Sequence, residues 1–294
     1  MPPPDAPVGP VDPPEEALPG PLGDAGLTRF VSAREAAGQG LPGWPEPGQP
    51  FPPPTLPVPE GRGGDQVIPR PLTATSGGPA PWAHLPAEQR RPTLADVREA
   101  FAAAGPAVRS EREGLPELDR ESAVLAPLYE LDGELHLVLT RRTWDLRSHQ
   151  GEVSFPGGRR DDADADLWTT AQREAHEEIG LPPDRVERIG ELDHLSTITS
   201  QSFIVPYVGA LPPGRPDLVA NPGEVSAVLH VPVAELLDPA IFREERWTFP
   251  WAEHRPIFFF ELVGDTLWGA TGAMVRQLLG LVTGTVARGG LEHM

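Results

Sequence analysis

Three glutamates on one predicted helix are the residues of this chain best suited to chemistry. The segment from Asp166 to Ile179 has the composition of a helix, and it contains Glu174, Glu177 and Glu178. Residues at positions i, i+3 and i+4 share one helix face, so the three carboxylates would lie side by side. A hard divalent cation would turn their repulsion into attraction, and Mg²⁺ prefers carboxylate oxygens, water and phosphate as ligands. The spacing therefore predicts a Mg²⁺ or Mn²⁺ site.

The alternative is a solvated acidic face, which is the usual explanation for paired glutamates on a helix. Two neighbouring features favour the metal site. An apolar stripe that includes Ala171 and Ala175 would anchor the other side of the helix on a sheet. A Pro-Gly-Gly turn precedes the helix, and Gly157 and Gly158 would let the backbone approach a phosphate closely.

A cluster of basic residues lies just upstream of this helix in an otherwise acidic chain. Guanidinium groups suit phosphate oxygens, although the same arginines could instead pair with surface carboxylates. His149 could contact a phosphate or cap a loop. The arginines of the cluster are Arg141, Arg142, Arg147, Arg159 and Arg160. The predicted substrate-binding residues are Arg141, Arg142, Arg147, His149, Gly157 and Gly158.

The segment PGGRRDDADADLWTTAQREAHEEIGL, residues 156–181, resembles the Nudix box. That pattern is G-x5-E-x7-R-E-U-x-E-E-x-G-U, where U is apolar, and Arg173–Leu181 matches its second half. The first half departs from it, because the loop after the paired glycines is one residue longer. The first glutamate of the pattern falls on Ala165, and either Asp164 or Asp166 could take its place.

A second resemblance narrows the subfamily. The run LVLTRRTWDLRSHQGEVSFPGGRRD, residues 137–161, is similar to the signature of the coenzyme A pyrophosphatase branch of Nudix hydrolases, which shares the longer loop. The segment LWGATGAMVRQLL, residues 267–279, resembles the closing strand and helix of that branch. The resemblance extends over residues 93–288. It implies metal-dependent hydrolysis of coenzyme A, or of its acyl derivatives, to 3′,5′-ADP and a 4′-phosphopantetheine.

The resemblance also implies roles for individual residues. The catalytic set would be Arg173, Glu174, Glu177, Glu178 and Glu224. Glu224 is included because similar proteins often place a carboxylate in a loop after the box, although a simple turn residue is the alternative. Which glutamate acts as the general base stays open. Two other functions also remain: hydrolysis of another nucleoside diphosphate linked to a group X, such as ADP-ribose or NADH, and nucleotide binding without hydrolysis.

The helix and its neighbours are expected to belong to an α/β fold. Strands are predicted at residues 123–129, 134–140, 151–155, 186–198, 202–208, 225–231 and 257–263, and helices at 93–103, 166–179 and 271–282. Asp132-Gly133 is a favoured hairpin turn between the first two strands. The Nudix resemblance implies an α/β/α sandwich around a mixed β-sheet.

Composition divides the chain in two. Its 39 prolines crowd the start, so residues 1–91 are predicted to be a disordered Pro-rich extension that hydrolysis does not need. Residues 92–294 are predicted to be the Nudix domain, which is of ordinary size for a domain.

Charge and cysteine usage limit the partners. A net charge of -19 argues against nucleic-acid binding. The Nudix resemblance implies a small-molecule nucleotide as the partner. The chain has no cysteine, which excludes disulfides and favours a cytoplasmic location. No apolar run approaches the ~20 residues of a membrane span. A homodimer is left open.

Overall fold

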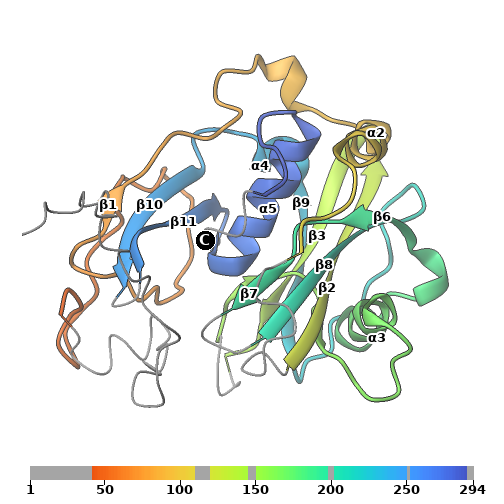
Figure 1. Cartoon of the computed structure of the whole chain (residues 1–294), viewed down its shortest axis with the longest axis horizontal. Coiled ribbons are helices and arrows are strands. Elements are labelled where there is room, and N and C mark those ends of the chain that lie inside the picture. Colours follow the sequence, from red (N-terminus) through yellow and green to blue (C-terminus); the bar gives the residue numbers. More distant parts are fainter. Residues whose placement is uncertain (1–41, 110–119, 145–149, 198–201, 250–251, 290–294) are drawn as a thin grey trace, which may run out of the picture. The chain divides into compact units, whose positions relative to one another are not determined.

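The strands predicted in the middle of the sequence form a mixed sheet of eight strands in the computed structural model of the chain (Figure 1). The structure describes residues 42–109, 120–144, 150–197, 202–249 and 252–289. The strands are β2 (Arg120–Leu131), β3 (Glu134–Arg142), β4 (Val153–Ser154), β5 (Gly157–Arg159), β6 (Glu187–Glu191), β7 (Leu195–Thr197), β8 (Ser202–Ala210) and β9 (Val225–Pro232). The main path runs β4-β3-β2-β8-β6, and β5, β7 and β9 pair with β2, β8 and β3. The β2–β8 pair is parallel, whereas the others are antiparallel.

A smaller antiparallel sheet accompanies the first. It contains β1 (Thr75–Ser76), β10 (Phe242–Phe249), β11 (Ala252–Leu262) and β12 (Asp265–Trp268), in that order. The short strand β12 contacts β4, so the two sheets meet at this point. The sequence did not predict β10, because its residues Arg243, Glu244 and Glu245 are charged. All three are nevertheless buried, and ion pairs make that burial tolerable.

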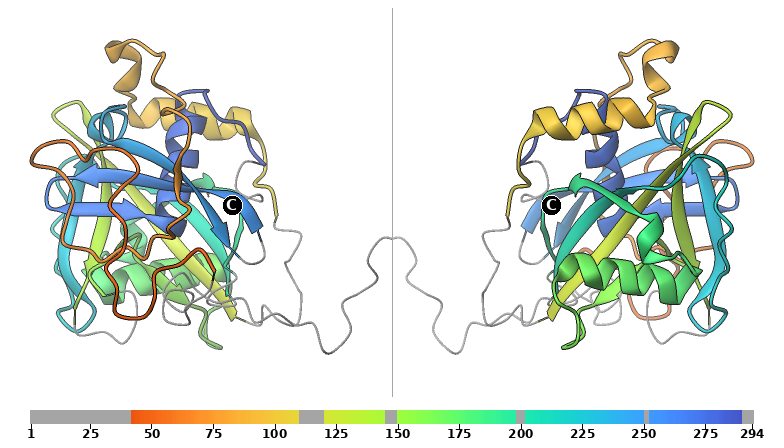
Figure 2. Two further views of the ribbon diagram at one scale, coloured as in Figure 1. Left: turned by 90° about the vertical axis from the view of Figure 1, so that its left-hand side faces the viewer. Right: turned by 90° about the vertical axis from the view of Figure 1, so that its right-hand side faces the viewer.

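Helices cover both faces of the large sheet (Figure 2). They are α2 (Leu94–Ala104), α3 (Leu167–Ile179), α4 (Val233–Leu236) and α5 (Gly269–Val282), with 3₁₀ turns at Ala87–Arg90 and Pro183–Arg185. Along β2, Ala123 and Leu125 pack in the cluster of α3, while Ala126 and Leu128 pack in the cluster of α2 and α5. Side chains that alternate between two apolar clusters are typical of a strand buried on both faces. The predicted α/β/α arrangement with a mixed sheet is confirmed.

The predicted hairpin turn and the predicted start of the first helix are both present in the structure. Asp132 and Gly133 have φ values of 52° and 80°, the left-handed conformations that a tight β2–β3 hairpin turn requires. Thr93 caps α2 by accepting from the Asp96 backbone N–H at 3.3 Å, and Asp96 accepts from the Thr93 N–H at 2.7 Å. The predicted strand at residues 186–198 is divided into β6 and β7. Residue 198 lies outside the described residues.

The described helices are too short to cross a membrane. The longest of them, α5, has 14 residues, whereas a membrane-spanning helix needs ~20.

Residues 42–91 differ from the sequence prediction, because they pack against the small sheet. Their strand β1 pairs with β10. Trp44 and Trp82 are buried, with 3% and 0% of their surface exposed. Arg70 is also buried, and its Nε donates to the two carboxylate oxygens of Glu245 at 2.8 and 3.0 Å. Two large aromatic side chains and one buried ion pair thus hold a segment whose proline content alone predicts disorder. The remainder of the predicted extension, residues 1–41, lies outside the described residues.

A chain that begins at residue 92 should therefore be much less stable than the full chain. It would uncover the surface that Trp44 and Trp82 protect and would remove a partner of buried Glu245. We expect a Tm lower by more than about 10 °C, or aggregation, when thermal unfolding is followed by circular dichroism. A chain that begins at residue 42 is the matched control, and its Tm should stay within about 2 °C of the parent value. An unchanged Tm after removal of residues 1–91 would contradict the conclusion that residues 42–91 stabilise the folded protein.

Candidate functional site

Helix α3 carries the three predicted glutamates, and both of its ends are fixed by local contacts. Asp166 is the N-cap, where its side chain accepts from the Thr169 backbone N–H at 2.7 Å. Gly180 ends the helix in the left-handed conformation with φ of 67°, and its N–H donates to the last turn. Ala171 and Ala175 are fully buried against the sheet. The buried alanines therefore fix the rotation of the helix, and with it the directions of the three carboxylates, of which Glu178 lies on the buried side.

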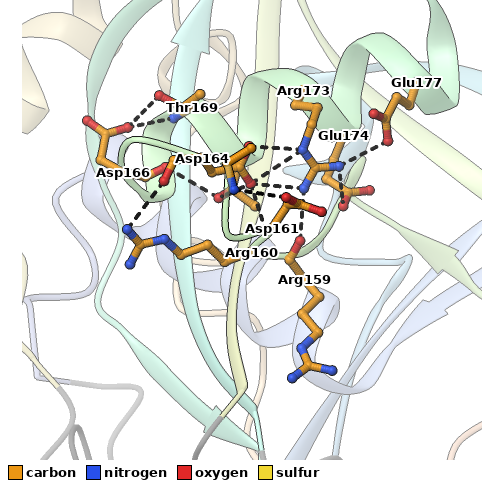
Figure 3. Close-up of polar contacts among 11 residues, drawn as sticks. Arg159, Arg160, Asp161, Asp164, Asp166, Thr169, Arg173, Glu174 and Glu177 are labelled. Atoms are coloured by element: carbon orange, nitrogen blue, oxygen red, sulfur yellow. Dashed lines mark hydrogen bonds and ion pairs between the residues drawn. The ribbon is translucent and has the colours of Figure 1, made fainter.

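Arg173 lies at the centre of the hydrogen-bond network around these carboxylates (Figure 3). Its Nη1 donates to Glu174 and to Glu177, at 3.0 Å in each case. Its Nε and Nη2 donate to Asp164, each at 3.0 Å, and Nη2 also donates to the backbone carbonyl of Arg159 at 2.9 Å. One planar guanidinium thus connects the loop before α3 to two of its glutamates. Arg173 therefore holds the carboxylates of Glu174 and Glu177 in place.

Of the two acids that could replace the first glutamate of the pattern, Asp164 is the one that contacts Arg173. Its carboxylate is buried and accepts from Arg173, from the Thr170 hydroxyl at 2.9 Å and from the Asp161 backbone N–H at 2.9 Å. The Arg173 guanidinium is the main reason that the pKa of the Asp164 carboxyl lies well below its usual value. Asp166 is engaged as the N-cap, so Asp164 is the acid that meets Arg173.

Glu178 is the most deeply buried of the three glutamates. Its side chain is 3% exposed, compared with 15% for Glu174 and 53% for Glu177. Burial raises the pKa of the Glu178 carboxyl to about 8, and the Arg142 guanidinium, 3.8 Å from Oε1, offsets part of this effect. Burial also raises the pKa of the Glu174 carboxyl. Among the described residues, Glu178 Oε2 has no hydrogen-bond partner.

At each of the two predicted glycines a side chain would collide with a neighbouring element. A Cβ on Gly158 would lie 2.6 Å from the carboxylate of Glu174. Gly157 has φ of 153°, and a Cβ there would lie 2.4 Å from the Ala123 carbonyl oxygen. The Gly157 backbone N–H also lowers the pKa of the Glu178 carboxyl, against the effect of burial. Gly158 is therefore required for β5 to approach α3 closely, and Gly157 for β5 to lie closely against β2.

Glu224 approaches the same carboxylates from a different part of the chain. Its backbone carbonyl accepts from the Thr143 N–H at 2.9 Å, which joins the turn before β9 to the end of β3. Its charge helps to raise the pKa of both Glu174 and Glu178. The fold therefore brings Glu224 into electrostatic range of the α3 glutamates.

The predicted arginine cluster is divided by the fold. Arg142 faces Glu178, whereas its neighbour Arg141 donates to Asp265 of β12 from Nε and Nη2, at 2.7 and 2.6 Å. Adjacent residues of a strand point to opposite faces, so these two arginines serve different regions. Arg160 pairs with Glu121 at 2.7 Å.

Two of the predicted substrate-binding residues, Arg147 and His149, lie outside the described residues. The side chain of Arg159 points away from the Arg173 network in Figure 3. Asp265 was not anticipated, because an isolated aspartate in a turn gives no sequence signal that it will be buried beside an arginine.

The donor set fits a hard divalent cation, although the described residues hold no preassembled group of three His, Asp or Glu side chains that could bind one. In this structure Arg173 donates hydrogen bonds to both Glu174 and Glu177. The buried Glu178 Oε2 lacks a partner, and a buried oxygen of this kind costs free energy until it finds one. Carboxylate oxygens are the ligands that Mg²⁺ and Mn²⁺ prefer.

Comparison with known proteins gives a family match. A model of the NUDIX domain matches residues 119–252. The uncharacterized Nudix hydrolase NudL of Photorhabdus laumondii is 36% identical over 164 residues, which cover 56% of this chain and 86% of that protein. NudL of Shigella flexneri serotype 5b is 35% identical over 197 residues, which cover 65% of this chain and 95% of that protein. Each of the two alignments thus leaves more than a third of this chain unmatched.

Solved structures show more distant similarity. An Ap4A hydrolase from C. elegans gives a TM-score of 0.35 at 17% identity, covering 41% of this chain and 85% of that one. The NUDIX domain of Shewanella oneidensis NrtR, solved with ADP ribose, gives 0.33 at 17% identity, covering 50% of this chain and 88% of that one.

Replacing Asp164 by Asn should destabilise the protein, because Arg173 would lose the charge of its buried partner. We expect the free energy of unfolding, measured by urea denaturation, to fall by about 3 kcal/mol. Asp162→Asn is the matched control, because Asp162 is exposed on the same turn; its effect should stay below about 0.5 kcal/mol. Equal stability of the two variants would show that Asp164 does not hold Arg173.

Replacing Glu178 by Gln should change how stability depends on pH in the metal-free protein. The pKa of Glu178 is about 8 in the folded state against an ordinary value of 4.5, so the folded protein binds this proton more tightly than the unfolded chain does. This group therefore lowers the free energy of unfolding as the pH rises from 4.5 to about 8. Glutamine stays neutral, so in Glu178→Gln this decrease in the free energy of unfolding should be absent.

Urea denaturation in a chelator at several pH values measures this effect, because other titrating groups cancel in the difference between parent and variant. Glu178→Gln should gain stability relative to the parent by on the order of a few kcal/mol between pH 5 and pH 8. A difference that is constant across this range would contradict the raised pKa.

Proposed function

This chain belongs to the Nudix hydrolase family, and from that premise we propose that it hydrolyses the pyrophosphate bond of coenzyme A or of an acyl-coenzyme A. The products are 3′,5′-ADP and a 4′-phosphopantetheine. The observation that supports metal-dependent hydrolysis, as distinct from the choice of substrate, is the buried Glu178 carboxylate, which has an unpartnered oxygen and lies near Glu174, Glu224 and Arg142. A buried carboxylate with these neighbours is suited to binding a cation, and a purely structural role would leave its oxygen without a partner.

Glu174, Glu177 and Glu178 would hold Mg²⁺ or Mn²⁺. When bound, the cation neutralises charge on the pyrophosphate and lowers the pKa of the attacking water. Arg173 maintains the positions of Glu174 and Glu177, and it is itself held by Asp164. Arg173 would thus limit the movement of two of the carboxylates that bind the cation.

Hydrolysis also needs a group that accepts a proton. The oxygen of the attacking water forms a bond to phosphorus, the bridging phosphorus–oxygen bond breaks, and the leaving phosphate keeps the electron pair. A carboxylate takes the proton of the water as the bond forms. Glu224 is one candidate for this base, and the α3 glutamates are the others. Arg142, next to Glu178, would stabilise charge on the phosphate oxygens.

The choice of coenzyme A rests on residues 137–161 and not on the metal-binding helix. The helix chemistry is shared by many pyrophosphate substrates, whereas coenzyme A differs from ADP-ribose in its 3′-phosphate and pantetheine arm. A 3′-phosphate dianion needs charge-assisted donors, and the arginine-rich run supplies them. Within this run, the roles of Arg147 and His149 stay predictions from the sequence.

A substrate panel tests the proposal. Coenzyme A, dephospho-coenzyme A, ADP-ribose and NADH are incubated with the enzyme and either Mg²⁺ or Mn²⁺, and the products are identified by mass spectrometry. We expect kcat/KM for coenzyme A to exceed that for dephospho-coenzyme A by roughly tenfold to a hundredfold, because charge-assisted bonds contribute ~1.5–3 kcal/mol. Glu178→Gln is the negative control, and its kcat should fall by orders of magnitude.

Each outcome of the panel has a distinct meaning. If ADP-ribose or NADH gives the highest kcat/KM, the coenzyme A assignment fails and the family assignment stands. If the nucleotides bind but none is cleaved, the chain is a nucleotide-binding member of the family without hydrolase activity.

A further inference from the structure

Gln66 connects the 42–91 segment to the edge of the candidate site. Its side-chain Nε2 donates to the Gly151 carbonyl oxygen at 3.1 Å and to Asp265 Oδ1 at 2.9 Å. Its Oε1 accepts from the Thr266 backbone N–H at 3.1 Å. These three bonds use both hydrogens of the amide and its oxygen, so the orientation of the amide is determined. Gln66 therefore links the β3–β4 connection to β12.

Asp265 is the partner that this amide shares with Arg141. The carboxylate of Asp265 is 1% exposed, and both of its oxygens accept from Arg141. The hydrogen bonds and the charge of Asp265 raise the pKa of the Arg141 guanidinium. The Arg141 side chain is 31% exposed, and two bonds to Asp265 leave three of its five N–H groups for other acceptors. Asp265 thus fixes the direction of a guanidinium that solvent can still reach.

The backbone around Gln66 is fitted closely to the turn between β11 and β12. The Gly63 N–H donates to the Leu262 carbonyl at 2.8 Å. A Cβ on Gly64 would lie 2.1 Å from Gln66 Oε1 and 2.7 Å from the Cα of Asp265. The absence of a side chain at Gly64 is therefore what allows the glutamine amide to reach Asp265.

We propose that Gln66 is a positioning residue for substrate recognition, acting through Asp265 on Arg141. This inference rests on the proposed function, because it takes Arg141 as a ligand for a phosphate of the substrate. Arg141 points to the opposite face of β3 from Arg142, which lies beside Glu178. Arg141 is thus placed to contact a part of the substrate remote from the pyrophosphate, and the 3′-phosphate of coenzyme A is such a group. Gln66 then influences substrate affinity and leaves the chemical step unaffected.

Steady-state kinetics with Gln66→Ala and Gln66→Glu test the recognition role. Glutamate matches the shape of glutamine but replaces the donor NH₂ with an acceptor oxygen that faces Asp265. For coenzyme A we expect KM to rise by about five- to tenfold while kcat stays within about twofold, as loss of one hydrogen bond predicts. For dephospho-coenzyme A, KM should change by less than about twofold. Val67→Ser is the matched control, because Val67 is the exposed neighbour of Gln66.

A double variant tests the route through Arg141. In the Arg141→Ala background, Gln66→Ala should raise KM for coenzyme A by no more than about twofold, because the two residues act on one contact. An undiminished effect in that background would overturn the proposal. An unchanged KM in the single variants of an enzyme that cleaves coenzyme A would also overturn it.

A measurement without substrate separates this proposal from the proposed function. The ¹H–¹⁵N signal of Arg141 Nε, assigned by its loss in Arg141→Ala, should shift or broaden in Gln66→Ala and stay unchanged in Val67→Ser. An unshifted signal in Gln66→Ala overturns the positioning role whatever the substrate is. If coenzyme A is not cleaved by the parent enzyme, the proposed function fails and this signal alone decides whether Gln66 positions Arg141.

Discussion

The candidate site depends on one guanidinium that compensates an excess of negative charge. Arg173 binds Asp164, Glu174 and Glu177 at the same time and also binds the Arg159 carbonyl. Without the guanidinium of Arg173, the carboxylates of α3 would repel one another and the preceding loop would lose its attachment to the helix. The longer loop of this chain is therefore accommodated, because Asp164 still reaches Arg173 from within it.

Burial separates the three glutamates of α3 into different environments. Glu177 is half exposed, whereas Glu178 is almost fully enclosed with a raised pKa and has one oxygen without a partner among the described residues. Arg142 compensates the charge of Glu178 only in part, from 3.8 Å. A divalent cation would complete the compensation, which is why a chain with a net charge of -19 is compatible with binding an anionic substrate through metal.

The segment at residues 42–91 contributes to the stability of the small sheet and also reaches the edge of the candidate site. Arg70 enters the buried ion pairs of the small sheet, where Glu245 also accepts from the Trp247 indole at 2.7 Å. Gln66 of the same segment reaches Asp265 at the junction of the two sheets.

Local patterns in the sequence determined the helix of the site, its caps and the hairpin at Asp132-Gly133, because each depends on residues close in the chain. The glutamate spacing also predicted the shared helix face. Only the tertiary structure decided which acid meets Arg173, that Arg141 and Arg142 diverge, and that residues 42–91 are packed. These outcomes depend on burial and on partners far apart in the sequence, such as Arg70 with Glu245 and Arg141 with Asp265. A charged residue gives the same signal in the sequence whether it is solvated or buried against a partner, so the choice between the two is made when the sheets pack.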